Sequence, residues 1–131
     1  GFENPHLAVA ALNPHAGDGG NFGREEIDII GPAVQNAIAA GVNAEGPWPA
    51  DTIFVRAKEG AYDGVVTMYH DQGQIAMKMM GFGSGITVLG GLPISVTTPA
   101  HGTAYDIAGQ GKANFAALAE AWRTCARMAA N

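Results

Sequence analysis

Two histidines follow apolar segments of this sequence, each at the point where the segment gives way to a polar turn. Leu7 to Leu12 is a continuous apolar run that ends in Asn13-Pro14-His15, and Gly64 to Tyr69 leads directly into His70-Asp71. Such runs are typical of strands buried in a parallel sheet, and parallel sheets bind ligands beyond the carboxyl ends of their strands. We therefore expect His15 and His70 to lie at one edge of a sheet.

Neutral imidazoles beside a carboxylate are common ligands of divalent metals. The natural carboxylate candidates are Asp71, which follows His70, and Asp51, which comes after the predicted Pro47-Trp48-Pro49 turn. The pattern thus favours a metal site built on the two strand ends. The alternative is that each histidine merely caps its strand by hydrogen bonding.

Two glycine-rich segments are candidates for cofactor binding. The first, Gly17 to Gly23, has Phe22 where a dinucleotide-binding motif requires glycine, so it is interpreted as a turn leading into a helix. The second runs from His101 to Asn114, where glycines and small residues alternate with donors and acceptors. Its groups able to hold an adenosine are the backbone amides of Gly102 and Gly109, the His101 imidazole, and the side chains of Asp106 and Asn114. The alternative is an irregular surface connection with Asn114 near a helix cap.

Lys78 and Cys125 complete the set of reactive side chains considered. Lys78 comes about two helical turns after His70, so it can face the same pocket, or it can be a solvated charge. Cys125 has no base fixed beside it by sequence and is interpreted as an inert core thiol.

Alternating strands and helices must position these residues. Helical spacing from Ile27 to Ile38 predicts a helix that Pro32 kinks or splits, and residues 43–49 read as a turn. A short helix through Ile75, Lys78 and Met79 is expected to end at Gly81. Strands are predicted over 86–89 and 94–98. A last helix presents Phe115, Leu118, Trp122, Cys125 and Ala129 on one face. The order indicates an α/β fold with a largely parallel sheet.

Composition excludes several classes of partner. Of 131 residues, 47% are hydrophobic, and 7 Lys+Arg against 12 Asp+Glu give a net charge of −5. No basic stripe offers contacts to nucleic acid or to an anionic membrane, and no apolar stretch is long enough to span one. The single cysteine fits a cytoplasmic setting. Because residues 7–12 form a buried strand at once and no methionine opens the chain, we expect a fragment of a longer protein.

Five motifs of this chain resemble the carboxy-terminal part of the 4-hydroxythreonine-4-phosphate dehydrogenase family. They are Leu12-Asn13-Pro14-His15-Ala16-Gly17-Asp18-Gly19-Gly20, Gly46-Pro47-Trp48-Pro49-Ala50-Asp51-Thr52, Met68-Tyr69-His70-Asp71-Gln72-Gly73, Gly81-Phe82-Gly83, and His101-Gly102-Thr103-Ala104 through Gly109-Gln110-Gly111-Lys112-Ala113. The resemblance covers nearly the whole chain. It implies the α/β/α sandwich of the isocitrate and isopropylmalate dehydrogenase type, of which residues 1–131 form the carboxy-terminal portion.

The resemblance also implies a cytoplasmic homodimer with NAD and a divalent ion, which is zinc, magnesium, manganese or cobalt. It implies that His15 and His70 are metal ligands and that a third histidine comes from elsewhere in the family's chain. Asp51 and Asp71 correspond to acidic residues lining the site and Lys78 to a lysine that contacts substrate. The adenosine-binding loop corresponds to His101, Gly102, Thr103, Ala104, Asp106 and Asn114.

The chain departs from the pyridoxal phosphate branch of this family at two substrate-contacting positions. Thr87 stands where that branch has asparagine, and Val96 stands where it has arginine. Because a guanidinium is the usual bidentate partner of phosphate, the chain is expected to act on a related hydroxy acid or diol, by NAD-dependent oxidation with decarboxylation. The alternative is a non-catalytic fragment or remnant domain that oligomerises or binds a partner.

Overall fold

The computed structural model describes residues 2–81 and 85–130. The chain forms two compact units, Gly1–Ala76 and Met77–Asn131, and the boundary between them falls inside helix α3 (His70–Gly81). The predicted short helix ending at Gly81 is thus confirmed. Part of the Gly81-Phe82-Gly83 motif lies outside the described residues.

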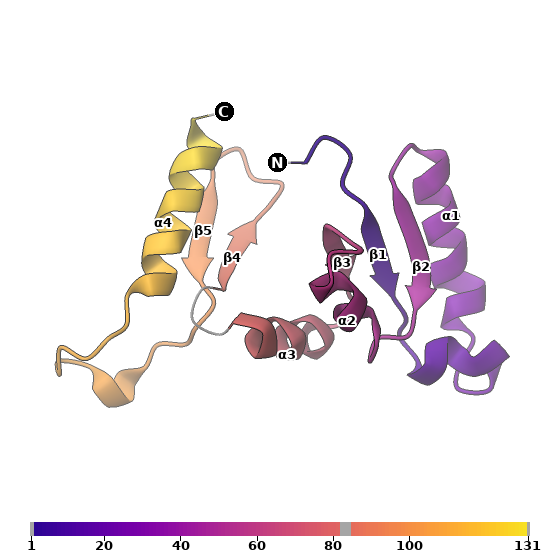
Figure 1. The fold of residues 1–131 in the computed structure, drawn as a ribbon, viewed down its shortest axis with the longest axis horizontal. Helices are drawn as coiled ribbons and strands as arrows, with labels where there is room; N and C mark the ends of the chain where they lie inside the picture. Colours follow the sequence, from indigo (N-terminus) through magenta and orange to yellow (C-terminus); the bar gives the residue numbers. More distant parts are fainter. Residues whose placement is uncertain (1, 82–84, 131) are drawn as a thin grey trace. The chain divides into compact units, whose positions relative to one another are not determined.

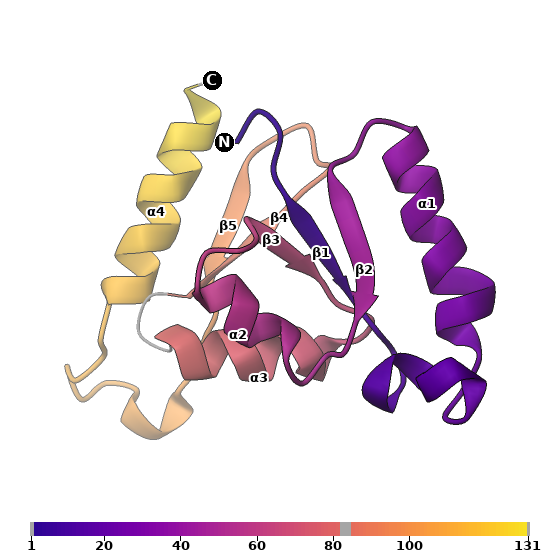
Figure 2. The ribbon, with the colours of Figure 1, turned by 45° about the vertical axis from the view of Figure 1, so that its right-hand side comes forward.

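A three-stranded parallel sheet forms the centre of the first unit. Its strands are β1 (Leu7–Ala10), β2 (Ala44–Trp48) and β3 (Gly64–Val66), in the order β2-β1-β3, and Leu7 lies opposite both Ala44 and Gly64. Figures 1 and 2 show the three strands running in the same direction. The parallel strands predicted to start at Leu7 and Gly64 are therefore confirmed, although both end earlier than their apolar runs. Burial is confirmed for Ala8 and Ala10 of β1, whereas Val66 of β3 is exposed.

Helices cover both faces of this sheet. On one face Ala8 and Ala10 are fully buried against Ile53, which opens α2 (Ile53–Lys58) and is 1% exposed. On the other, Leu7 and Val9 line an apolar pocket with side chains of α1 (Gly31–Ala39). Since successive strand residues point to opposite faces, β1 contributes to both layers. This is the expected α/β/α layering, and burying a side chain such as Ile53 contributes about 1.5–3 kcal/mol.

The segment 43–49 is not the turn that its composition predicts. Its residues form β2, at the edge of the described sheet, and α2 follows as a helix that sequence reasoning did not predict. The register with β1 shifts between Ala8 and Ala10, beside Gly46-Pro47. Gly46 has φ +137°, and a Cβ there would lie 2.5 Å from the Val9 carbonyl oxygen. An edge strand with a bulge tolerates glycine and proline that a central strand excludes.

The helix predicted from Ile27 is split, as Pro32 suggests. A wide π-type turn, η2 (Glu26–Ile30), precedes α1, and a Cβ at Gly31 would lie 2.8 Å from the carbonyl oxygen of Glu26. Because Pro32 has no N–H, the regular hydrogen-bond ladder cannot run through this point.

The second unit consists of a hairpin and a helix. Strands β4 (Ile86–Leu89) and β5 (Val96–Pro99) pair antiparallel, and α4 (Ala116–Ala129) packs against them. The expectation of a largely parallel sheet is therefore wrong for this unit. The second strand also begins at Val96 rather than Ile94, and the Thr97 hydroxyl of β5 donates to the Ala121 carbonyl of α4 at 2.8 Å.

The buried face of α4 is not the large apolar face that the sequence indicates. Ala117 and Ala121 are 7% and 2% exposed, whereas Phe115, Leu118 and Trp122 are exposed. Small side chains allow the helix backbone to approach the hairpin closely, which the bond from Thr97 to the Ala121 carbonyl requires. Cys125 is half-buried, with its Sγ 3.4 Å from the Ser95 carbonyl oxygen. Among the described residues, no helix has the length and apolar character needed to cross a membrane.

Candidate functional site

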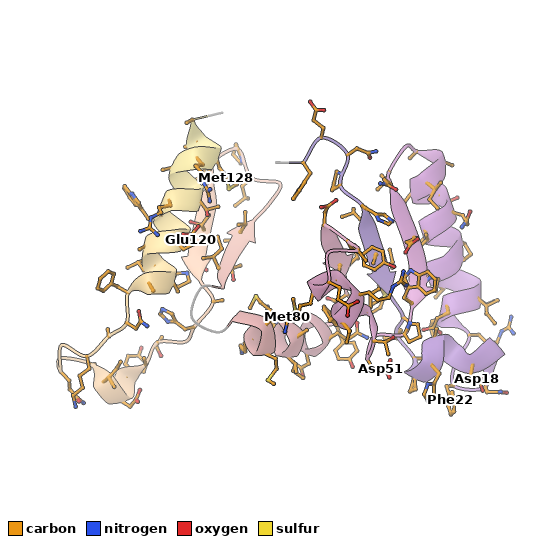
Figure 3. The ribbon with its side chains drawn as sticks, in the orientation of Figure 1. Asp18, Phe22, Asp51, Met80, Glu120 and Met128 are labelled. Carbon is orange, nitrogen blue, oxygen red and sulfur yellow. The ribbon has the colours of Figure 1, made fainter. Side chains whose placement is uncertain are left out.

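The carboxyl ends of all three parallel strands carry candidate site residues. His15 follows β1, Asp51 follows β2, and Tyr69-His70-Asp71 follows β3. A pocket of about 460 Å³ at this edge is lined by Leu12, Asn13, Pro14, His15, Ala50, Asp51, Tyr69 and Gln72. Figure 3 shows Asp51 at the same end of the sheet as the loop that carries Asp18 and Phe22. Asp51 thus follows a strand rather than the predicted turn, which brings it to the edge expected for ligand binding.

A second pocket of about 280 Å³ adjoins the first, because both contain Ala50, Asp51, Tyr69 and Gln72. Asp71 lines this second pocket. His70 is the exposed first residue of α3, between Tyr69 and Asp71, and does not itself line either of these two pockets. The structure therefore places His15 and Asp51 in the first pocket and Asp51 and Asp71 in the second, while His70 lies beside the second pocket in sequence only.

His15 lies in a turn of unusual handedness. Within η1 (Pro14–Gly20), the non-glycine residues His15, Ala16 and Asp18 have φ of 53°, 54° and 44°, in the left-handed region. Each L residue held there costs roughly 1–2 kcal/mol. Such strain persists where the surroundings enforce it, and it gathers at functional sites. The glycine-rich segment leads into a helix, as predicted, but part of it forms the helical turn η1.

A buried carboxylate supports this turn. Glu26 is 5% exposed, and its oxygens accept hydrogen bonds from the backbone N–H groups of Leu12 and Asn13 and from Asn13 Nδ2. Burial acts to raise the pKa of Glu26, but the bonds from the Asn13 side chain and the two backbone groups outweigh it and hold that pKa below its usual value. In the sequence, the only signal was an acidic residue after a glycine-rich loop.

Gln72 connects the ends of two strands. Its Nε2 donates to the carbonyl oxygen of Ala11 at 2.8 Å, and its Oε1 accepts from the N–H of Met68 at 2.9 Å. The side chain therefore ties the end of β1 to the start of α3, which carries His70. Gly73 permits the close packing, since a Cβ there would lie 3.3 Å from Thr67 Oγ1. Gln72 belongs to one of the five family motifs, but the sequence alone predicted no role for its side chain.

The pocket beside the strand ends contains two side chains of types that bind divalent ions. The imidazole of His15 and the carboxylate of Asp51 both line it, and zinc, cobalt and manganese accept ligands of these kinds. Within residues 2–81 and 85–130, no three His, Cys, Asp or Glu side chains come together as a metal-binding group. Metal binding by His15 and His70 therefore stays a prediction.

The His101 segment of the second unit is an exposed loop. His101 Nδ1 lies 2.9 Å from the carbonyl oxygen of its neighbour Gly102, and Ala104 has φ 49°. Asn114 Oδ1 accepts from the N–H of Ala116, the first residue of α4, so Asn114 lies next to the N-cap residue Phe115, near a helix cap as its alternative interpretation had it. Roles for Gly102, Thr103 and Asp106 in cofactor binding remain predictions.

The remaining predicted site residues, Lys78, Thr87 and Val96, also belong to the second unit. Thr87 lies opposite Thr98, and Leu89 opposite Val96. Because side chains alternate along strands and Thr97 bonds to α4, Thr87 and Val96 share the ribbon face that points away from the helix. Substrate contacts by exposed Thr87, half-buried Val96 and exposed Lys78 stay predictions.

Comparisons with known proteins show which proteins this chain resembles. The sequence pattern of the family described as "Pyridoxal phosphate biosynthetic protein PdxA" matches residues 1–125. The curated protein "Putative 4-hydroxythreonine-4-phosphate dehydrogenase 2" of Rhizobium meliloti (strain 1021) is 63% identical over 129 residues, which are 98% of this chain and 37% of that protein. The chain therefore spans little more than a third of this relative.

Solved structures share the fold. 4-Hydroxythreonine-4-phosphate dehydrogenase from Klebsiella pneumoniae superposes with a TM-score of 0.86 at 47% identity, covering 100% of this chain and 40% of that one. A terephthalate 1,2-cis-dihydrodiol dehydrogenase from Burkholderia xenovorans LB400 gives a TM-score of 0.64 at 31% identity, covering 95% of this chain and 39% of that one. The same fold thus occurs in dehydrogenases whose names specify different substrates.

Proposed function

Because this chain belongs to the PdxA family of pyridoxal phosphate biosynthetic proteins, we propose that it is part of a metal- and NAD-dependent dehydrogenase acting on a secondary alcohol beside a carboxylate. The observation that carries the proposal is the edge of the first unit's sheet, where three strand ends bring an imidazole and two carboxylates to adjoining pockets. His15 and His70 are two of the proposed ligands, and a homodimer is the proposed assembly.

Different residues of the chain are proposed to carry out different steps of the reaction. A divalent ion, when bound, supplies Lewis acidity toward the substrate's hydroxyl and carboxylate oxygens, and NAD is the hydride acceptor. Asp51 and Asp71 line the hollow in which the hydroxyl proton must be accepted, so they are the proposed proton acceptors. Loss of carbon dioxide from the oxidised β-keto acid is the proposed second step, in which Lys78 orients the substrate or donates the proton that replaces carbon dioxide on carbon.

The substrate class is proposed from the ribbon face of the second unit. Valine at position 96 offers no charge to a phosphate, whereas it suits an apolar or ring portion of a substrate. The Burkholderia xenovorans relative, whose name specifies a dihydrodiol, supports an unphosphorylated hydroxy acid or diol. The name of the Rhizobium meliloti relative specifies a phosphorylated substrate, so phosphorylation is the point for the assay to decide.

The His101 to Asn114 loop is proposed to bind NAD in preference to NADP. The loop carries Asp106, and Lys112 is its one cation. A 2′-phosphate generally requires an arginine or a pair of cations. Steady-state kinetics with both cofactors test this preference, and a lower KM for NADP would refute it.

The central experiment measures NADH formation by the protein expressed from its complete reading frame. The substrates are phosphorylated and unphosphorylated hydroxy acids and diols, each with and without zinc, magnesium, manganese or cobalt. We expect metal-dependent turnover that His15→Ala and His70→Ala abolish together with metal content. His6→Ala is the matched control, because His6 belongs to the same unit but contacts Ala61 and Tyr62 instead of the pockets. Normal metal content in the doubly substituted protein would overturn the assignment.

A second candidate function is non-catalytic association. Phe115, Leu118 and Trp122 form an exposed apolar surface on α4, with a hollow of about 430 Å³. Exposed apolar patches commonly mark protein contacts. Absence of turnover with every substrate and metal, together with a concentration-dependent oligomer that Trp122→Ala weakens, would favour this function.

A further inference from the structure

The buried carboxylate of Glu26 has no part in the proposed reaction. It is the one buried charged side chain among the described residues, and it does not line the two site pockets. Placing a carboxylate in such surroundings is unfavourable unless its oxygens are hydrogen-bonded. The contacts that compensate for its burial therefore indicate what this side chain does.

Those contacts are made to the segment that leads into His15. Oε1 of Glu26 accepts the N–H groups of Leu12 and Asn13, each at 2.8 Å, and Oε2 accepts Asn13 Nδ2 at 2.9 Å. Pro14, the next residue, has no N–H to donate. Glu26 thus holds the last two backbone donors that precede His15.

The same carboxylate lies under the body of the left-handed turn. A Cβ at Gly17 would be 2.7 Å from Glu26 Oε2, so only glycine allows the turn to close over this oxygen. Glu26 is therefore in contact with the residues before His15 and lies close to the residue two positions after it. A turn that includes His15 and Ala16 in the left-handed region needs such external support.

We propose that Glu26 is a positioning residue that fixes the left-handed turn and thereby the place of the His15 imidazole. The inference rests on the proposed function, in which His15 is a metal ligand. Glu26 acts through the backbone of residues 12–17 and does not touch the ion. Groups hydrogen-bonded directly to metal ligands typically change metal affinity by 10–100-fold when removed, which sets the scale for the effect expected from Glu26.

The test compares three variants of the protein expressed from its complete reading frame. Zinc affinity is measured by competition with a chromophoric chelator, and amide hydrogen exchange is followed at Leu12 and Asn13. Glu26→Ala removes both acceptors and is expected to weaken zinc binding about 10–100-fold. Glu26→Gln is expected to weaken it less, because the amide oxygen can still accept the two backbone groups.

Glu25→Gln is the matched control. Glu25 lies next to Glu26 and accepts only from Asn13 Nδ2, at 2.6 Å, so the backbone donors stay in place. We expect its zinc affinity to stay within about twofold of the parent protein. The exchange of Leu12 and Asn13 amides is expected to be faster in both Glu26 variants and unchanged in this one.

The outcomes separate this inference from the proposed function. If His15→Ala abolishes zinc binding while a folded Glu26→Gln protein exchanges the two amides faster but binds zinc as the parent does, Glu26 is merely structural. Should Glu26→Ala fail to fold, the Glu26→Gln result decides alone. If zinc binding survives His15→Ala, the proposed function itself is wrong.

Discussion

The two units of the chain hold their candidate site residues in different ways. In the first unit, Glu26 and Gln72 bond to the backbone at the end of β1, across 13 and 61 residues of sequence. In the second, the side chains of His101 and Gln110 bond to carbonyl groups at most four residues away, and the loop around them is exposed. The candidate residues of the first unit are therefore held by tertiary contacts, whereas the loop of the second unit is held by local contacts.

This difference agrees with the roles proposed for the two units, in which the first binds a metal ion and the loop of the second binds a cofactor. A metal ion requires ligands within a few tenths of an ångström of their places, so the residues that present them need support from other elements. A loop that closes on a cofactor belongs to the less stable parts of a protein, because it must open again. Each of the following predictions tests one side of this contrast.

The largest effect is expected from Gln72→Leu, which removes the connection between β1 and α3. The carbonyl of fully buried Ala11 and the N–H of Met68 both lose their partner, so the free energy of unfolding should fall by about 2–3 kcal/mol. Denaturant unfolding measures it. Gln74→Leu, on the same helix and without a side-chain hydrogen bond in the described part of the chain, should stay within about 0.5 kcal/mol. Equal losses in the two variants would show that Gln72 holds nothing in place.

A change of substrate specificity in the second unit should cost little free energy of unfolding. Val96→Arg with Thr87→Asn adds a charge-assisted contact to phosphate, worth roughly 1.5–3 kcal/mol. We expect kcat/KM for 4-hydroxythreonine 4-phosphate to rise about tenfold to a hundredfold, from a low value, with little change in melting temperature. Leu92→Arg controls for added charge, since Leu92 lies in the loop between β4 and β5. Efficient turnover of that compound by the unmodified protein would mean that other residues hold the phosphate.

Acid should weaken the first unit through Glu26. Because its pKa is lowered on folding, this carboxylate contributes stability above its ordinary pKa of 4.5, and that contribution is lost as the pH falls through the folded-state pKa. The difference in melting temperature between the parent and Glu26→Gln should therefore be larger at about pH 7 than at about pH 3. A difference that does not change with pH would contradict the bonded carboxylate.

The smallest effect is expected from His101→Ala in the exposed loop. Its only described partner is the neighbouring Gly102 carbonyl, so the melting temperature should not change. Loss of one contact to NAD should raise the KM for NAD about threefold to tenfold. An unchanged KM would remove His101 from the proposed cofactor site.

Sequence patterns alone determined much of this molecule. The buried strands starting at Leu7 and Gly64, the helix ending at Gly81 and the break at Pro32 were all predicted, because each depends on residues adjacent in the chain. The expectation that His15, His70 and Asp71 stand at strand ends followed from the same local patterns, and the motifs indicated the family, whereas the strand before Asp51 was not predicted.

Only the tertiary structure decided the rest. The composition of Gly46-Pro47 predicts a turn, but pairing with β1 makes this segment a strand. The sequence of α4 presents a large apolar face, but the side chains buried against the hairpin are those of Ala117 and Ala121. Likewise, nothing in the sequence around Glu26 indicates that the N–H groups of Leu12 and Asn13 bond to its carboxylate and that the side chain is buried. In each case the deciding partner is distant in sequence, and packing chooses it by shape and hydrogen bonding, which local periodicity does not contain.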